Sequence, residues 1–421
     1  QEGTCGYEDH PPVILQGHMD MVCDKDADCP IDMDTDGLDV MHDGEFVFAK
    51  GTTLGGDNGI AVAYMLALLA DKTIPHPPLE MIITVDEETG MDGAAGIDLT
   101  ALKGRTMINL DSEDEGVFTV SCAGGARARL RLPVKRKPVY GPCVRLSVEG
   151  LQGGHSGVDI HKNIIGANKV MANFLLRINR HMKFSIISIS GGSKDNAIAR
   201  TCYVDAVLLG NDAEKINEIA EQLQKELRDY YDEPDLVIYG DNLDAMGGHA
   251  LSVEDTSTVI ALLINIPTGV RKWLDKETEM VQTSLNLGVV KSEEDGVNLT
   301  FSVRSCVNED KREALNMLKS SAEKYGAEYS EGGDYPAWEY KEQSPLRDTM
   351  VALYRKMYGK EPKVVAIHAG LECGMLSEKL PGLDCVSIGP DMQDIHTSRE
   401  RLNIRSTERT WEFLKEILKA L

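Results

Sequence analysis

The chain has 421 residues, more than one hydrophobic core usually organises, so two domains are expected. Its composition, 42% apolar and 27% charged, is that of an ordinary globular protein, and no apolar run approaches the roughly 18 residues that a membrane span needs. It carries 44 basic against 68 acidic residues, a formal charge of −24, and such a surface would repel a phosphate backbone, so nucleic-acid binding is not expected.

The first third of the chain alternates strand and helix patterns. Short apolar runs predict buried strands at Val13–Gln16, Met81–Val85 and Met107–Leu110. Between the first two strands, Gly59–Leu69 predicts a helix that a glycine-rich turn opens. This alternation is typical of a mainly parallel sheet with helices on its faces.

The middle of the chain, from about residue 123 to residue 332, has a different pattern that occurs twice. Each copy has a helix and then two strands, at residues 168–178, 185–192 and 201–209 in the first and 258–266, 283–290 and 297–304 in the second. About 98 residues separate the corresponding strands, which indicates a duplicated α+β unit. The alternative, chance similarity of two amphipathic stretches, stays open at this point.

The last ninety residues return to the first pattern. They predict a helix at about Leu346–Met357, a strand at Cys385–Ile388 and an amphipathic helix at Ser406–Leu421. The fold class is therefore predicted to be α/β. A mainly parallel sheet sandwiched by helices is built from residues 1–122 and 333–421, and residues 123–332 form an inserted, duplicated α+β lid domain.

Acidic and imidazole side chains follow the predicted strands of the first third. His18 comes after the first strand, Glu88 after the next, and Asp111 after the third, while Asp57 lies in the turn before the helix. Residues at the carboxyl ends of parallel strands converge on one crevice, where His396 would complete a set of five. Each motif alone is weak, since HxD, GGDNG and EE also occur in ordinary loops. Together they would repel one another unless two divalent cations, zinc or else cobalt or manganese, lay between them.

The motifs GHMDMV, TTLGGDNGIAVA, VDEETGMDGA, INLDSEDEG, GGHSGVDI and IHTSRERL carry a resemblance to a known family. They are similar to those of the co-catalytic zinc exopeptidases, which include carboxypeptidase G, succinyl-diaminopimelate desuccinylase and the bacterial dipeptidases. Within that family they look most like the aminoacyl-histidine dipeptidases, over essentially the whole chain. The resemblance implies hydrolysis of dipeptides, with Xaa-His and carnosine-like substrates preferred. It also implies that residues upstream of Gln1 are missing from this sequence.

The resemblance assigns a role to each candidate metal ligand. His18 and Asp111 would hold one metal ion, Glu88 and His396 the other, and Asp57 would bridge both. In the family, the peptide bond after the bridging aspartate is often cis.

Two further acids are assigned to catalysis. Asp20, two residues beyond His18, would orient that imidazole, and Glu87, next to Glu88, would be the general base that activates a metal-bridging water.

Substrate contacts are assigned to residues of the lid and of a later loop. His155 in GGHSG would stabilise the oxyanion, Asn196 and Arg304 would bind substrate, and Gly370 in HAGLECG would meet its C-terminus through backbone groups. His368 of the same loop is either a substrate contact or a strand-end residue. Family members with one lid unit are dimers whose partner lends a histidine and an asparagine. The duplication therefore predicts an active site that is complete in a monomer, and a homodimer stays compatible with it.

Other interpretations remain at this stage. Within the enzyme class, the chain is alternatively a broader dipeptidase, a tripeptide aminopeptidase or an N-acyl amino-acid deacylase. A non-catalytic metal or peptide binder would be expected to lack a ligand or the base, yet all are present. Serine or cysteine hydrolysis lacks a G-x-S-x-G elbow. The nine cysteines form no CxxC pair, which favours reduced thiols and a cytoplasmic location.

Overall fold

The computed structural model describes residues 1–210, 213–277 and 279–421, and the chain divides into two compact units. The first unit comprises Gln1–Cys122, Trp338–Ile367 and Leu371–Leu421. The second comprises Ala123–Ala337 together with His368–Gly370. It runs past residue 332, the boundary expected from the sequence, because strand β17 (Glu328–Tyr335) continues to pair along β7 (Gly124–Pro133).

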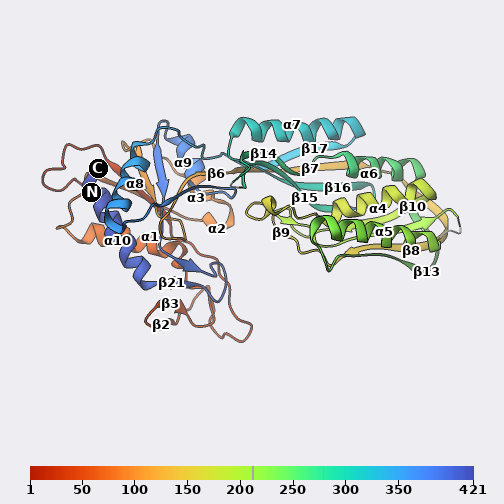
Figure 1. Ribbon diagram of the computed structural model, residues 1–421, viewed down its shortest axis with the longest axis horizontal. Helices are drawn as coiled ribbons and strands as arrows, with labels where there is room; N and C mark the ends of the chain where they lie inside the picture. The colour runs from red at the N-terminus through yellow and green to blue at the C-terminus, as the bar shows by residue number, and fades with distance from the viewer. Residues whose placement is uncertain (211–212, 278) are drawn as a thin grey trace. The chain divides into compact units, whose positions relative to one another are not determined.

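The first unit is built on a six-stranded sheet with the strand order β18-β6-β19-β5-β1-β4. Figure 1 labels β6 of this sheet and the helices α1, α8 and α10 of the same unit. Its strands are β1 (Val13–His18), β4 (Leu79–Thr84), β5 (Thr106–Asn109), β6 (Val117–Cys122), β18 (Lys363–Ile367) and β19 (Asp384–Ser387). Neighbouring strands are parallel except for β6 and β19. The predicted α/β class with a mainly parallel sheet is confirmed.

Three long helices of the first unit bury one side each in its core. They are α1 (Gly56–Ala70), α8 (Pro345–Tyr358) and α10 (Ile404–Ala420), all within two or three residues of the predicted ranges. Helix α8 begins at a serine cap, since Ser344 accepts a hydrogen bond from the backbone N–H of Arg347, and Pro345 occupies the first helical position. Phe118 of β6 stacks on Phe413 of α10, which joins the sheet to the helical layer.

Shorter elements complete the first unit. The helices are α2 (Glu87–Gly90), α3 (Asp92–Gly96) and α9 (Cys373–Lys379). A separate four-stranded sheet has the order β2 (Val40–His42), β3 (Phe46–Ala49), β21 (Arg401–Asn403) and β20 (Met392–Gln393). No helix among the described residues is both long and apolar enough to cross a membrane.

The second unit contains a nine-stranded sheet whose two halves have the same topology. Its path is β13-β8-β12-β10-β15-β16-β7-β17, with β14 (Gly269–Asp275) paired to β15 off this path. The other strands on this path are β8 (Arg136–Glu149), β10 (Phe184–Gly191), β12 (Cys202–Leu208), β13 (Val237–Leu251), β15 (Met280–Ser292) and β16 (Gly296–Ser305). The long helices of the unit are α4 (Ala167–His181), α5 (Ala213–Tyr231), α6 (Val253–Asn265) and α7 (Asn308–Tyr325).

In chain order, β8, α4, β10, β12, α5 and β13 form one half, and β7, α6, β15, β16, α7 and β17 form the other. Each half orders its four strands 4-1-3-2, and the halves meet where β10 pairs with β15. The duplication expected from the sequence is therefore present, with the first half inserted between β7 and α6 of the second.

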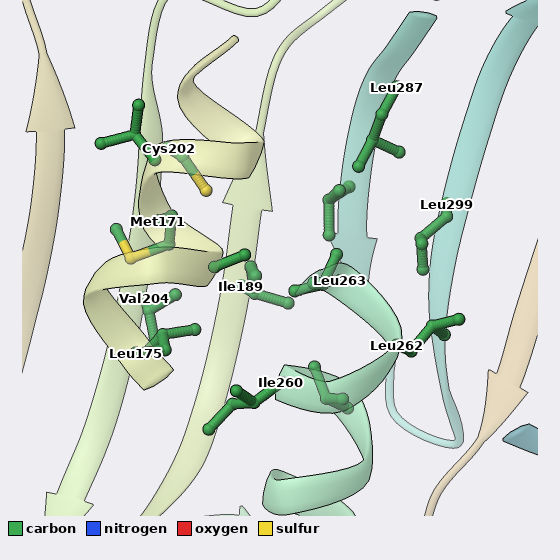
Figure 2. Close-up of a cluster of buried hydrophobic side chains, with 14 of the residues drawn as sticks. Met171, Leu175, Ile189, Cys202, Val204, Ile260, Leu262, Leu263, Leu287 and Leu299 are labelled. Atoms are coloured by element: carbon green, nitrogen blue, oxygen red, sulfur yellow. The ribbon is translucent and has the colours of Figure 1, made fainter. Parts of the chain in front are cut away.

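One hydrophobic core runs through both halves of the second unit. Figure 2 shows Met171 and Leu175 of α4 beside β10 and β12, and Leu263 of α6 among the side chains of Ile189 and Leu287. All five of these side chains are almost completely buried. Since strands and helices from both halves contribute to one core, the halves are expected to fold as a single cooperative body.

Candidate metal centre and a second polar cluster

Three neighbouring parallel strands of the first unit end at the same edge of its sheet. In the strand register His18 lies beside Thr84, and Gln16 lies beside Asn109. The segments that follow β4 and β5 therefore start next to the end of β1. This arrangement brings Asp111 and the first turn of α2 to the carboxyl end of β1, where parallel α/β sheets bind their ligands.

All five predicted metal ligands lie together at this edge. His18, Asp57 and Asp111 form one group whose potential ligand atoms lie within 4.8 Å of one another. Asp57, Glu88 and His396 form a second such group. Asp57 belongs to both groups, so one of its carboxylate oxygens can face each of two cations.

The two carboxylate oxygens of Asp57 lie close to different imidazoles. Oδ1 lies 3.3 Å from His18 Nε2, and Oδ2 lies 3.0 Å from His396 Nε2. Each imidazole also lies near a second carboxylate. His18 Nε2 is 3.4 Å from Asp111 Oδ1, and His396 Nε2 is 3.1 Å from Glu88 Oε1. Two groups of nitrogen and carboxylate donors that share one carboxylate fit a pair of divalent cations.

Protonation of the two imidazoles offsets part of the carboxylate charge when no cation is bound. Burial alone would lower the pKa of His18, but its interactions with Asp111 and Asp57 raise that pKa to about 12. Hydrogen bonds to Asp57 and Glu88 raise the pKa of His396 to about 10. A divalent cation would take the place of these protons, because metal binding requires the neutral imidazole.

The two acids assigned to catalysis also lie in this cluster. Burial, with the charge of Asp111, raises the pKa of Glu87 to about 8. His18 Nδ1 lies 3.0 Å from the backbone oxygen of Asp20 and 3.5 Å from its carboxylate Oδ1. Asp20 Oδ2 accepts a hydrogen bond of 3.1 Å from the backbone N–H of Glu88. Asp20 therefore contacts candidate ligands of both groups.

Asn58, to which no sequence pattern assigned a role, connects three of these segments through its side chain. Its Oδ1 accepts from the backbone N–H of His18 at 3.2 Å, and its Nδ2 donates to the backbone oxygen of Leu110 at 2.8 Å. A Cβ on Gly17 would overlap the Asn58 amide, so glycine there permits the close approach of β1. The Asp57–Asn58 peptide bond is cis.

Glu372, at the start of α9, is a second functional candidate that no sequence pattern indicated. It is fully buried, and its Oε2 accepts hydrogen bonds from Gln16 Nε2 at 2.5 Å and from Thr84 Oγ1 at 2.6 Å. Burial raises the pKa of its carboxyl group. Gln16 in turn accepts a hydrogen bond from Asn109, so a polar network lies directly below the strand ends.

In the second unit, the loop that carries His155 fixes the tautomer of its imidazole. Nδ1 accepts the backbone N–H groups of Gly157 and Val158, both at 3.3 Å, which leaves the proton on Nε2. Burial and the nearby charge of Arg304 lower the pKa of His155. The imidazole is therefore a neutral N–H donor near pH 7.

Asn196 lies beside this loop, because β9 (Gly154–His155) pairs with β11 (Ala197–Ile198). The backbone N–H of Ser156 donates to the backbone oxygen of Asn196 at 2.8 Å, and the Asn196 residue is exposed. Asn286 of β15 supports the loop from the other half of the duplication. Its Nδ2 donates to the backbone oxygens on either side of Asn196, those of Asp195 at 2.8 Å and Ala197 at 2.9 Å.

Arg304 and His368 complete the polar cluster of the second unit. Arg304 is 9% exposed and donates to the Tyr335 hydroxyl at 3.2 Å, with no carboxylate in ion-pair range among the described residues. Its strand neighbour Ser284 bonds His368 Nε2 at 2.7 Å, and burial lowers the pKa of His368 to about 3. Gly370, two residues further, is half-buried.

The comparisons with known proteins agree across the whole chain. A model of "Peptidase family M20/M25/M40" matches residues 14–420. The cytosol non-specific dipeptidase of Escherichia coli (strain K12) is 36% identical over 99% of this chain and 87% of its own length. The crystal structure of aminoacylhistidine dipeptidase from Vibrio alginolyticus is also 36% identical, with a TM-score of 0.91, and the match covers 100% of this chain and 86% of that one.

A more distant solved structure shows the same fold at low identity. Aminopeptidase PepT from Bacillus cereus is 16% identical with a TM-score of 0.53, over 99% of this chain and 82% of that one.

Proposed function

This chain belongs to peptidase family M20/M25/M40 and is a metallopeptidase that cleaves dipeptides, and we propose that two divalent cations bound around Asp57 support the reaction. The observation that carries the proposal is the position of the Asp57 carboxylate, with one oxygen toward each group of candidate ligands. We assign His18 and Asp111 to one cation, Glu88 and His396 to the other, and Asp57 to both. Zinc suits this donor set, and cobalt or manganese are alternatives.

Glu87 is the general base of the proposed reaction. Bound divalent cations would lower the pKa of a shared water and polarise the scissile carbonyl. Glu87 takes the proton of that water and then delivers it to the leaving amine. Its raised pKa in the metal-free protein supports this role, because a base that titrates near neutral pH can both accept and return a proton. Asp20 orients His18 through the contacts to Nδ1.

We assign the polar cluster of the second unit to the same dipeptide. His155 donates its Nε2–H to the oxyanion of the tetrahedral intermediate, and its fixed tautomer supports this role. Arg304 binds the substrate's C-terminal carboxylate, because a buried guanidinium without an anionic partner among the described residues is costly until an anion arrives. Asn196 and the backbone at Gly370 provide further contacts to the substrate.

The proposed substrates are dipeptides that include Xaa-His. The names of the two relatives with 36% identity support this choice, one a non-specific dipeptidase and the other an aminoacylhistidine dipeptidase. A panel of Ala-His, β-Ala-His, Gly-Gly-Gly and N-acetyl amino acids tests it. Hydrolysis of Ala-His is expected, with little turnover of the tripeptide or the acyl amino acids. Faster cleavage of Gly-Gly-Gly or of an N-acetyl amino acid would replace the proposal by a tripeptidase or a deacylase.

Metal analysis of the same preparation is the second part of the test. Two equivalents of divalent metal per chain are expected, together with loss of Ala-His hydrolysis in a chelator and its return with Zn²⁺, Co²⁺ or Mn²⁺. One equivalent, or full activity in the chelator, would contradict the two-cation assignment.

Two further proposals concern the setting of the enzyme. The nine cysteines are all free, which together with the name of the Escherichia coli relative supports a cytoplasmic location.

Both halves of the duplicated unit supply proposed substrate contacts, His155 and Asn196 from the first and Arg304 from the second. This supports an active site that one chain completes, and a homodimer is compatible with it. Gel filtration gives the oligomeric state at a protein concentration around which specific activity does not change with concentration. A monomer in that sample would show that one chain is active by itself.

A further inference from the structure

The loop that carries Asp57 is held by a buried carboxylate distant in sequence. Glu400 Oε2 accepts the backbone N–H groups of Leu54 at 2.9 Å and Gly55 at 3.0 Å, and Oε1 accepts that of Asp57 at 3.2 Å. The Glu400 residue is 2% exposed. These N–H groups precede the regular part of α1, so the helix itself gives them no acceptor.

Glu400 shares its turn with His396. The backbone N–H of Glu400 donates to Thr397 at 3.1 Å, and His396 has a left-handed backbone with φ of 60°. The turn therefore contacts Asp57 twice, through His396 Nε2 at the carboxylate and through Glu400 Oε1 at the backbone N–H. Displacement of the turn would therefore move two candidate ligands together, His396 and Asp57.

We propose that Glu400 is a positioning residue that holds the Asp57 loop in its ligand geometry before any cation binds. The inference rests on the proposed function of Asp57 as the shared ligand. Three charge-assisted hydrogen bonds from one loop fix its backbone more firmly than neutral contacts would. A ligand loop that is already ordered binds its cations without first losing conformational freedom, and therefore binds them more tightly.

The test compares Glu400→Gln with Glu80→Gln as a matched control. Glu80, at the amino end of β4, also accepts backbone N–H groups with its carboxylate, those of Lys103 at 2.9 Å and Gly104 at 2.8 Å. It lies at the opposite end of the strand from the candidate ligands. In both variants an amide nitrogen replaces one acceptor oxygen, so both are expected to lower the Tm.

Metal affinity separates the two variants. Competition between each metal-free protein and a chromophoric chelator for Zn²⁺ or Co²⁺ is expected to show about 10- to 100-fold weaker binding in Glu400→Gln, with Glu80→Gln like the wild type. Equal affinity in Glu400→Gln and wild type would overturn the inference. If the wild type itself bound fewer than two ions, the proposed function would fail instead.

A measurement on the wild-type protein keeps the inference testable if Glu400→Gln does not fold. In the metal-free protein, the amide hydrogens of Leu54, Gly55 and Asp57 are expected to exchange slowly, as in the metal-loaded protein. Fast exchange that slows only when Zn²⁺ is added would show that the cation orders the loop, and the inference would be wrong.

Discussion

His18, the last residue of β1, and Asp111, two residues past the end of β5, face each other, with Nε2 of the histidine 3.4 Å from Oδ1 of the aspartate. Both side chains are almost fully buried. Without a cation, the pair retains a proton, because the contact with Asp111 raises the pKa of His18 and burial raises the pKa of Asp111. With a cation, the imidazole must be neutral and the metal carries the positive charge. A rise in pH should therefore destabilise the metal-free protein, whereas it should strengthen the binding of a cation.

We predict that the metal-free protein loses stability as the pH rises, whereas the stabilisation by Zn²⁺ grows. The folded-state pKa values of His396, about 10, and His18, about 12, lie above the ordinary value of 6.5. The folded state then binds more protons than the unfolded state, so this stability is present below pH 6.5 and is lost as the pH rises through 10. Tm measured from pH 6 to pH 10 with and without Zn²⁺ should diverge. Parallel curves would contradict the prediction.

We predict that Glu87→Gln removes turnover but keeps metal binding. The amide cannot accept the water's proton, so kcat for Ala-His should fall about 100- to 10,000-fold. Zinc stoichiometry should stay at the wild-type value, because Glu88 supplies the proposed ligand. Asp86→Asn, at the exposed neighbouring position, is the control and should keep wild-type kcat. Full turnover in Glu87→Gln would remove Glu87 as the base.

We predict that Arg304→Ala raises KM more than it lowers kcat. Loss of a charged hydrogen-bonding partner costs about 1.5–3 kcal/mol, which corresponds to an increase in KM of about 10- to 100-fold. Arg129→Ala, at an exposed position of β7, should leave KM unchanged. An unchanged KM in Arg304→Ala would take Arg304 out of the proposed substrate site.

We predict that Gly157→Ala impairs catalysis by displacing the His155 loop. A Cβ at this position would lie 2.5 Å from the backbone oxygen of His368 and 3.0 Å from His155 Cε1. The imidazole would have to move, and kcat should fall because the oxyanion donor is misplaced. In Gly332→Ala of β17 nothing lies within 4 Å of the added Cβ, so wild-type kcat is expected. Wild-type kcat in Gly157→Ala would argue against His155 as that donor.

Local pattern in the sequence was sufficient for the strands and helices predicted above and for the candidate ligands that follow them, whereas α5, α7 and the four-stranded sheet that contains β21 were not predicted. Buried strands such as Val13–His18 are short apolar runs, and parallel strands present their carboxyl ends on one edge, so His18 and Asp111 could be expected to meet. The duplicated helix and strands were visible for the same reason, because each copy repeats its own apolar periodicity. The groups that hold these residues in place were not visible in any local pattern.

The amino-acid sequence by itself thus determined the α/β class, the duplicated insertion and four candidate ligands, since these follow from periodicity and from residues next to strand ends or to the turn that opens a helix, whereas His396 rested on the family resemblance. Only the tertiary structure decided that Glu400 binds the Asp57 loop from 343 residues away and that Glu372 bonds Gln16 across 356 residues. A buried carboxylate selects its partners by the donors that the finished fold places within about 3 Å, and chain separation carries no information about that distance.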